Sequence, residues 1–227
     1  MTGKSFLSAV LLCTFALLFQ PEPATALAAE PEERVEALPS DLPGYSMEDL
    51  RKLADLVQRT GVETDRIPAL DRPEYVSIAD AGLSLDDDDI VFLVNYPNGL
   101  LRIYPRRILL WHEVVNDVIP DHEGNIPLRS APGVQEAAGE RYTISYSPLS
   151  GCVTAFRSMA GRYPSSFGVS GTLLNGNSVL YDRISRSLWS QILAVSIEGP
   201  LRGKRLQRIP VLWATWKGVK ERFGGLN

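Results

Sequence analysis

Short segments of alternating apolar and polar residues fill most of the chain from residue 66 onward, and turn-forming residues separate them. Residues 90–96 and 100–104 flank Asn98-Gly99, a pair typical of a tight β-hairpin turn. Six further segments of this kind follow, at residues 142–146, 152–157, 167–174, 178–182, 194–198 and 204–209. A period of two residues is typical of half-buried strands. The pattern predicts an α+β, β-rich single domain built on an antiparallel meander or barrel-like sheet.

A few short helices are expected around this sheet. Near the N-terminus, Ser46 has the position of an N-cap, with Asp49 three residues later as an acidic capping partner. The residues after it are spaced for one apolar helix face: Leu50, Leu53 and Val57. Gly61 is a typical stop signal. At the other end, Thr215 is placed to cap a short helix that runs to Phe223.

Residues 107–118 predict a further helix. Apolar residues there are spaced three, four and three positions apart, at Ile108, Trp111, Val115 and Val118. Strand alternation fails because residues 108–111 form a continuous apolar run. On a helical wheel with about 100° per residue, four polar side chains fall on one arc, namely His112, Glu113, Asn116 and Asp117.

The N-terminal region has the features of a secretory signal peptide. Lys4 supplies a positive charge, and residues 6–19 are almost wholly apolar, about one h-region long and too short to span a bilayer. Small residues at 24, 26 and 28 fit a cleavage site. We expect a signal peptide at 1–28, a Glu-, Ala- and Pro-rich linker at 29–45, a helical accessory at 46–65 and a main β-rich domain at 66–227. Export to the periplasm or beyond follows, with an uncleaved anchor as the alternative.

Composition adds few constraints. The 227 residues include 23 Lys and Arg against 27 Asp and Glu, so the charge pattern of a nucleic-acid-binding protein is lacking. Once the signal peptide is removed, no transmembrane segment is expected. Cys152 would then be the remaining cysteine, with a buried and inert thiol as its default interpretation. The four acids at 86–89 lack the spaced ligands of a calcium loop and predict a solvated turn before a strand.

Four segments in a fixed order resemble one known family. They are Arg102-Ile-Tyr-Pro105 running into residues 108–117, Tyr146-Ser-Pro-Leu-Ser-Gly151, Phe167-Gly-Val-Ser-Gly171, and Tyr181-Asp-Arg183 with Ser187-Leu-Trp189. Together, over about residues 66–223, they resemble the uncharacterised family called domain of unknown function 3179. Its members commonly carry Cys-Pro-Leu-Cys or Cys-Pro-Leu-Thr in the second segment. This chain has Ser147 and Ser150 there, so the resemblance implies no thiolate chemistry and no established activity.

The polar arc carries the first candidate site. His112 is one of two histidines, and an imidazole beside Glu113 has the chemistry of a general base or a metal ligand. Neighbouring residues on a helix diverge, so a shared ligand would need a group from elsewhere, such as Asp182. The structural alternative is that Asn116 and Asp117 cap the helix end while His112 bonds to a loop.

The second group of candidates lies outside the arc. Asp182 and Arg183 are either a base or ligand beside an anion clamp, or a structural ion pair. Ser147 stands at a strand-to-turn junction suited to a nucleophile, although its neighbours do not form a Gly-x-Ser-x-Gly elbow. Arg102 is either a ligand-binding residue or structural.

Three functional classes stay open from sequence alone. The first is an exported binding domain that holds a small anion or a hard metal in a pocket between the 107–118 helix and the meander. The second is an extracytoplasmic enzyme with His112 as base or metal ligand. The third is a non-catalytic assembly module with a protein partner. The sequence does not identify a cofactor.

Overall fold

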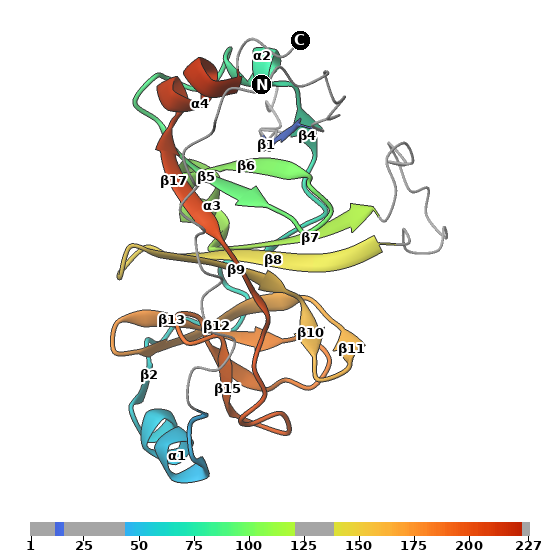
Figure 1. Ribbon diagram of the computed structural model, residues 1–227. Helices are drawn as coiled ribbons and strands as arrows, with labels where there is room; N and C mark the ends of the chain where they lie inside the picture. The colour runs from blue at the N-terminus through green and yellow to red at the C-terminus, as the bar shows by residue number, and fades with distance from the viewer. Residues whose placement is uncertain (1–11, 16–43, 121–138, 224–227) are drawn as a thin grey trace, which may run out of the picture.

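Three stacked five-stranded sheets make up the protein in a computed structural model that describes residues 12–15, 44–120 and 139–223 (Figure 1). The upper sheet has the order β17 (Val211–Thr215), β5 (Ile90–Asn95), β6 (Leu101–Pro105), β1 (Leu12–Phe15), β4 (Tyr75–Val76). The middle sheet has the order β16 (Arg208–Ile209), β9 (Cys152–Arg157), β8 (Gly139–Ser147), β7 (Val114–Pro120), β3 (Leu70–Asp71). The lower sheet has the order β15 (Val195–Glu198), β14 (Leu188–Ser190), β13 (Asn177–Asp182), β12 (Phe167–Leu174), β2 (Val57–Arg59).

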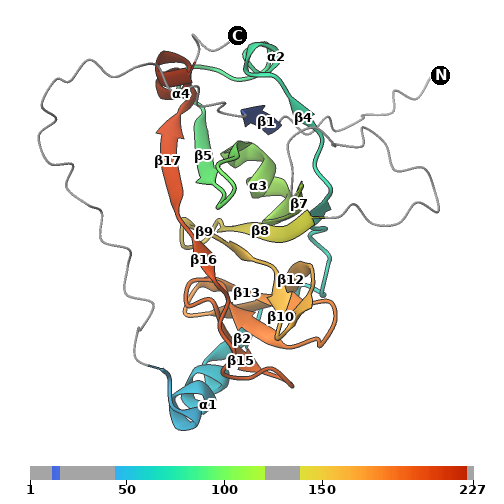
Figure 2. The same ribbon diagram turned by 45° about the vertical axis from the view of Figure 1, so that its right-hand side comes forward.

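Helices cover the two outer faces of this stack (Figure 2). Near the upper sheet lie α2 (Ile78–Ala81) and α4 (Trp216–Phe223), and α1 (Met47–Asp55) packs on the lower sheet. The short α3 (Arg106–His112) connects the upper sheet to the middle one, and a small hairpin joins β10 (Met159–Ala160) to β11 (Tyr163–Pro164). The strand pairs are antiparallel except β1–β4 and β3–β7. The predicted α+β, β-rich single domain is therefore confirmed.

The middle sheet is buried on both faces. In β8 the side chains of Tyr142, Ile144 and Tyr146 point into the space below the upper sheet, which we call the upper interlayer. Thr143, Ser145 and Ser147 alternate with them and so face the lower sheet, across the lower interlayer. The upper interlayer is filled mainly by aliphatic and aromatic side chains, whereas the lower one holds many buried hydroxyls.

The predicted hairpin and acidic turn are both confirmed. β5 and β6 pair in register from Val91–Pro105 to Asn95–Leu101 around the turn at Asn98-Gly99. Gly99 has a φ of +85°, which L-residues with side chains rarely adopt. The acids at 86–89 form a turn before β5, and the carbonyl of Asp89 accepts a hydrogen bond from the N–H of Trp216 at the start of α4.

The predicted helix over 107–118 is wrong beyond its first half. α3 ends at His112, Glu113 takes a left-handed conformation with a φ of 55°, and the chain continues as β7. The β-branched pair Val114-Val115 favours a strand, and seven residues of β7 pair with β8. The apparent helical spacing joined two helix residues to two strand residues by coincidence.

The N-terminal helix is shorter than predicted. Ser46 and Asp49 form the expected capping box, but α1 stops at Asp55. Val57 belongs to β2, which pairs with the edge of β12, so the glycine at 61 follows a strand rather than a helix. Tertiary pairing with the lower sheet thus overrides the helical spacing of Val57.

The motif at 167–171 has a backbone reason for its second glycine. β12 carries a bulge between Val169 and Thr172, and Gly171 within it has a φ of +76°. A Cβ at this position would lie 2.0 Å from the carbonyl oxygen of Val62. Only glycine accommodates both the turn of the bulge and the close passage of the neighbouring chain.

The tryptophans divide into two groups. Trp189 and Trp216 are core residues, as expected. Trp111, which the helical spacing places on the apolar face, is instead 79% exposed, because the buried residue of α3 is Leu109. Trp213 is half exposed and packs edge-on against Phe92. None of the helices in the described part of the chain has the length and apolarity needed to cross a membrane.

Candidate functional site

The four residues of the predicted polar arc do not share one face, because two of them end α3 and two belong to β7. Since β7 is a strand, Asn116 and Asp117 point to opposite sides of it. Asp117 faces the upper interlayer and Asn116 faces the lower one, while His112 and Glu113 stay near the end of α3. The arc therefore separates into three clusters, and no single site contains its four members.

Asp117 is the centre of the first cluster. Its carboxylate accepts two hydrogen bonds from Nη1 of Arg102, at 3.0 and 2.8 Å, and one from the Tyr104 hydroxyl at 2.9 Å. Tyr75 donates a further hydrogen bond, and the Arg102 guanidinium lies 3.6 Å from the centre of the Tyr75 ring. Arg102 and Asp117 are only 2% and 4% exposed. This buried ion pair joins the upper sheet to the middle sheet.

Burial controls the protonation of this cluster. Loss of solvation raises the pKa of Asp117 to about 6, although Arg102 and the Tyr104 hydroxyl oppose the shift. Burial likewise raises the pKa of Tyr104 and of Tyr96 well above the usual tyrosine value. Nε of Arg102 is a buried donor without a hydrogen-bond partner in the described structure. Nε of Arg102 could therefore donate to one further acceptor.

A cavity of about 530 Å³ opens at the rim of the upper interlayer. We call it the rim cavity, and it is lined by Asn95, Tyr96, Pro97, Gly99, Glu140, Tyr142, Arg157, Gln207, Arg208, Ile209 and Pro210. The Tyr96 hydroxyl lies 2.6 Å from that of Tyr104, so hydrogen bonds connect the cavity wall to Asp117. The rim cavity lies at the opposite end of the strands from α3, and none of the predicted site residues lines it.

Charge in the rim cavity comes from one ion pair. Arg157 contacts Glu140, and the Tyr142 hydroxyl donates to the same carboxylate. Arg157 and Glu140 are 42% and 39% exposed, so the pair remains accessible to solvent. Arg208 is opposite Phe156 in the β9–β16 register, which turns its side chain toward the lower interlayer, where it donates to the carbonyl of Ile192.

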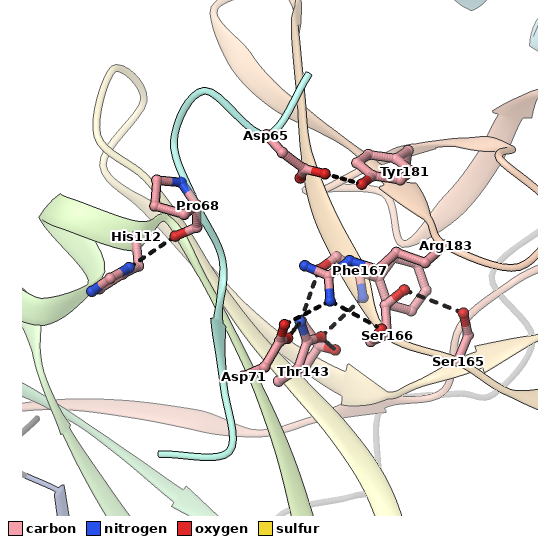
Figure 3. A network of polar contacts seen from close by, with 11 residues as sticks. Asp65, Pro68, Asp71, His112, Thr143, Ser165, Ser166, Phe167, Tyr181 and Arg183 are labelled. Carbon is pink, nitrogen blue, oxygen red and sulfur yellow. Dashed lines mark hydrogen bonds and ion pairs between the residues drawn. The ribbon is translucent and has the colours of Figure 1, made fainter. Parts of the chain in front are cut away.

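Asn116 forms the second cluster, whose wider network is drawn in Figure 3. Its amide nitrogen donates to the carbonyl of Phe167 and to Asp71, both at 2.8 Å. Its amide oxygen accepts from the N–H of Phe167 at 2.9 Å and from Thr143 at 2.8 Å. The carboxamide pairs with the backbone of β12 as another peptide group would. With these bonds made, Asn116 fastens the middle sheet to the lower one.

Asp182 and Arg183 do not pair with each other. Arg183 donates to Asp71 at 2.7 Å, and this partner raises the pKa of its guanidinium against the opposing effect of burial (Figure 3). Asp182 is fully buried and accepts hydrogen bonds from Ser185 and from the Trp189 indole at 3.0 Å. Asp182 therefore organises the turn after β13, and the ion-pair alternative for Asp182 and Arg183 is wrong in its partners, although both residues are engaged in the fold.

His112 and Glu113 belong to the third cluster. Nδ1 of His112 is 2.8 Å from the carbonyl oxygen of Pro68, which fits the loop-binding alternative (Figure 3). Glu113 turns the other way and accepts from the Ser178 hydroxyl at 3.2 Å, while burial raises the pKa of its carboxyl. Since β7 has replaced the helix end, Asn116 and Asp117 are not helix caps.

The serines of the second motif, one buried at the end of β8 and one exposed in the following turn, both bond to the lower sheet. The hydroxyl of Ser147 accepts the N–H of Ser178 at 3.1 Å, and that of Ser150 accepts from Asn177 at 3.0 Å. Gln191 is bonded to Asn177 and to the carbonyls of Ser145 and Cys152. Ser147 is fully buried, so no substrate reaches it in this conformation. Burial raises the pKa of the Cys152 thiol, in agreement with an inert cysteine.

The described residues offer no cluster of three or more His, Cys, Asp or Glu side chains that would hold a metal ion. A protein site for zinc or calcium takes at least three such ligands. The candidate His112 is bonded to a backbone carbonyl, and the carboxylate of Glu113 is turned away from it toward Ser178. Among these residues, the chemistry of the clusters is hydrogen bonding and ion pairing.

Comparison with known proteins assigns the family. The family model described as "Protein of unknown function (DUF3179)" matches residues 64–127 and 134–225. The chain belongs to the DUF3179 family. No curated protein and no solved structure matches it. The resemblance expected from the four sequence segments is thus confirmed.

The motifs of this DUF3179 domain can now be located. The first spans β6, α3 and β7 and supplies the Arg102–Asp117 pair, and the second forms the turn between β8 and β9. The rim cavity, by contrast, was missed by sequence reasoning. In the sequence, Tyr96 and Tyr142 alternate with polar residues as ordinary core residues of a strand do. Their hydroxyl groups were the one indication of a polar site, because a buried hydroxyl needs a polar partner.

Proposed function

We propose that the protein is an exported binding protein whose rim cavity takes a small organic anion. The observation that carries this proposal is the position of Arg157, a half-exposed cation on the wall of a cavity whose other walls include Tyr96, Tyr142 and Ile209. Pockets of about 300–1,000 Å³ suit small molecules, and a few polar groups in an otherwise apolar wall fix their orientation.

The bound group would be a carboxylate. Arg157 already contacts Glu140, but an accessible ion pair contributes only about 0–1 kcal/mol, so exchanging Glu140 for a ligand carboxylate costs little. A guanidinium matches the planar, two-oxygen geometry of a carboxylate. The two phenol rings and Ile209 would lie against the apolar part of the ligand, and the amides of Asn95 and Gln207 are available at the rim.

This proposal keeps the anion of the sequence hypothesis and moves its site. The predicted residues His112, Glu113 and Ser147 are at the other end of the strands, and their side chains or backbone are engaged in the fold. A metal is not proposed, because the described residues bring no adequate ligand set together.

Binding can be tested by calorimetric titration with benzoate, hexanoate, succinate and inorganic phosphate. We expect the apolar monocarboxylates to bind most tightly, and Arg157→Gln to weaken them about tenfold or more, since hydrogen bonds to charged groups contribute roughly 1.5–3 kcal/mol. Arg208→Gln is the matched control, because this arginine borders the cavity while its side chain faces the other interlayer. Absence of binding by all four compounds, or equal weakening by both variants, would contradict the proposal.

Export has its own test. We expect the protein recovered from outside the cytoplasm to begin between residues 25 and 29, as measured by mass spectrometry of the intact chain. A recovered chain that starts at Met1 would contradict cleavage, and recovery from the cytoplasm alone would contradict export.

A further inference from the structure

We propose that the mature protein has a strand-acceptor slot between β4 and β6, which takes an extended segment of a partner polypeptide with the pattern apolar, hydrogen-bond acceptor, apolar. β1 occupies this position in the structure, parallel to β4 and antiparallel to β6 (Figure 1). The proposal rests on the export part of the proposed function, because β1 (Leu12–Phe15) lies inside the predicted signal peptide.

The slot has the width of a single strand. β1 pairs with β6 through three residues and with β4 through two, so both neighbours have backbone groups directed at it. Removal of residues 1–28 would leave these groups without their ladder. Exposed strand edges of this kind bind extended chain segments by continuing the sheet, and backbone hydrogen bonds supply much of the affinity.

The two walls of the slot are held together independently of β1. The Arg102 guanidinium of β6 lies 3.6 Å from the centre of the Tyr75 ring of β4, and both side chains bond to Asp117 of the middle sheet. On the other face, Val76, Leu101 and Ile103 pack in one apolar cluster with α2 and α4. The slot is therefore preformed, and a guest strand does not have to assemble its own walls.

The register specifies the guest. Residues directly opposite each other in a sheet share a face. The guest residues opposite Ile103 and Leu101 therefore meet the apolar cluster and should be apolar. The guest residue between them is opposite Arg102, whose buried Nε has no partner among the described residues, and should carry an acceptor oxygen. Thr14 holds this position in β1, and Nε of Arg102 is still without a partner there, so a guest residue with a longer acceptor side chain fits the position better.

Hydrogen–deuterium exchange on the exported protein tests this slot. The probe is a synthetic peptide of residues 10–17 with valine in place of Cys13 and two lysines at each end for solubility. We expect it to slow the exchange of the amides of residues 75–76 and of Leu101 and Ile103, which face the slot, about tenfold or more. Exchange in β5, which lies between β17 and β6, serves as the internal control and should not change.

Two altered peptides identify the mode of binding. The Thr14→Pro peptide lacks a backbone donor within the guest strand and should give no protection. The Thr14→Gln peptide keeps the strand and carries a longer acceptor toward Nε of Arg102, and should bind about fivefold to tenfold more tightly.

Three results would overturn the proposal. The first is slow exchange of the Leu101 and Ile103 amides in the peptide-free monomer, which would mean that the mature chain fills the slot itself. The second is equal protection by the Thr14→Pro peptide. The third is retention of residues 12–15 in the exported protein. The slot can fail in the first two ways while the rim cavity still binds carboxylates, so the two proposals are separable.

Discussion

Buried polar groups have different kinds of partners on the two faces of the middle sheet. In the upper interlayer, polarity is concentrated in one ion pair, Arg102–Asp117, surrounded by tyrosine hydroxyls and an otherwise apolar core. In the lower interlayer, polarity is spread over many groups, most of them neutral, such as Asn116, Thr143 and Ser147, and the buried Asp182 there is held by several hydrogen bonds instead of one cation. One strand, β7, supplies Asp117 to the first and Asn116 to the second.

The comparison shows where the fold is vulnerable. A buried charge depends on its partner, because removing that partner leaves the full desolvation cost uncompensated. A distributed neutral network loses only the bonds of the residue removed. We therefore expect graded effects, with the upper interlayer more sensitive to single substitutions than the lower one.

The largest effect is expected for Arg102→Met. It leaves the Asp117 carboxylate buried without its cation and should lower the free energy of unfolding by about 3–5 kcal/mol at pH 8, measured by urea denaturation. The double variant Arg102→Met/Asp117→Leu removes both charges and should recover part of the loss. A double variant as unstable as the single one would show that the charge is not the cause.

Acidity provides the next effect. The folded pKa of Asp117, about 6, lies above its unfolded value of about 3.9. The folded state therefore holds this proton more tightly, and stability declines as pH rises from about 4 to 6. The side chain of Asp117→Asn does not titrate. Across that window the free energy of unfolding of the wild type should therefore fall by on the order of 3 kcal/mol more than that of the variant. Parallel stability curves for the two proteins would refute the assignment to Asp117.

Asn116→Ala tests the lower interlayer. It removes the carboxamide that binds both backbone groups of Phe167, and should cost roughly 2–3 kcal/mol in urea denaturation. Gln58→Ala, at an exposed position on the edge strand β2, is the control and should change stability by less than about 0.5 kcal/mol. A cost for Asn116→Ala equal to that of the control would contradict the fastening role.

The smallest effects come from two serines on the same face of β8. Ser147→Ala leaves the N–H of Ser178 without its acceptor and should cost about 1–2 kcal/mol. Ser145 is equally buried, but its hydroxyl has no partner in the described structure, so Ser145→Ala should be neutral or slightly stabilising. Thermal denaturation of the two variants side by side decides the point, and equal shifts would contradict it.

Local pattern was enough to predict most strands and turns. The hairpin at 98–99 and β9 and β12 could be predicted closely because alternation and turn residues agree there. The change at Glu113 could not, since a non-glycine residue in a left-handed conformation gives no sequence signal and the following strand is stabilised by pairing with β8. That one change moved Asn116 and Asp117 from one polar arc to two interlayers.

Site prediction failed for a related reason. The sequence does not show whether a polar residue in a strand binds a ligand or bonds within the fold, because its partners come from neighbouring sheets. Asp182 and Arg183 are adjacent in sequence, yet their partners are Trp189 and Asp71. The rim cavity is made by segments more than a hundred residues apart, from Asn95 to Pro210, and no local spacing connects them.

The position of β17 limits when this protein can fold. β17 is the last strand among the described residues, and it pairs with β5 along five residues, after which Trp216 of α4 completes the outer core of the upper sheet. The upper sheet therefore cannot close until synthesis has passed residue 215, and pairings of such long sequence separation form slowly. Until β17 is added, the outer edge of β5 stays unpaired in the newly made chain, whereas the local β5–β6 hairpin can form first.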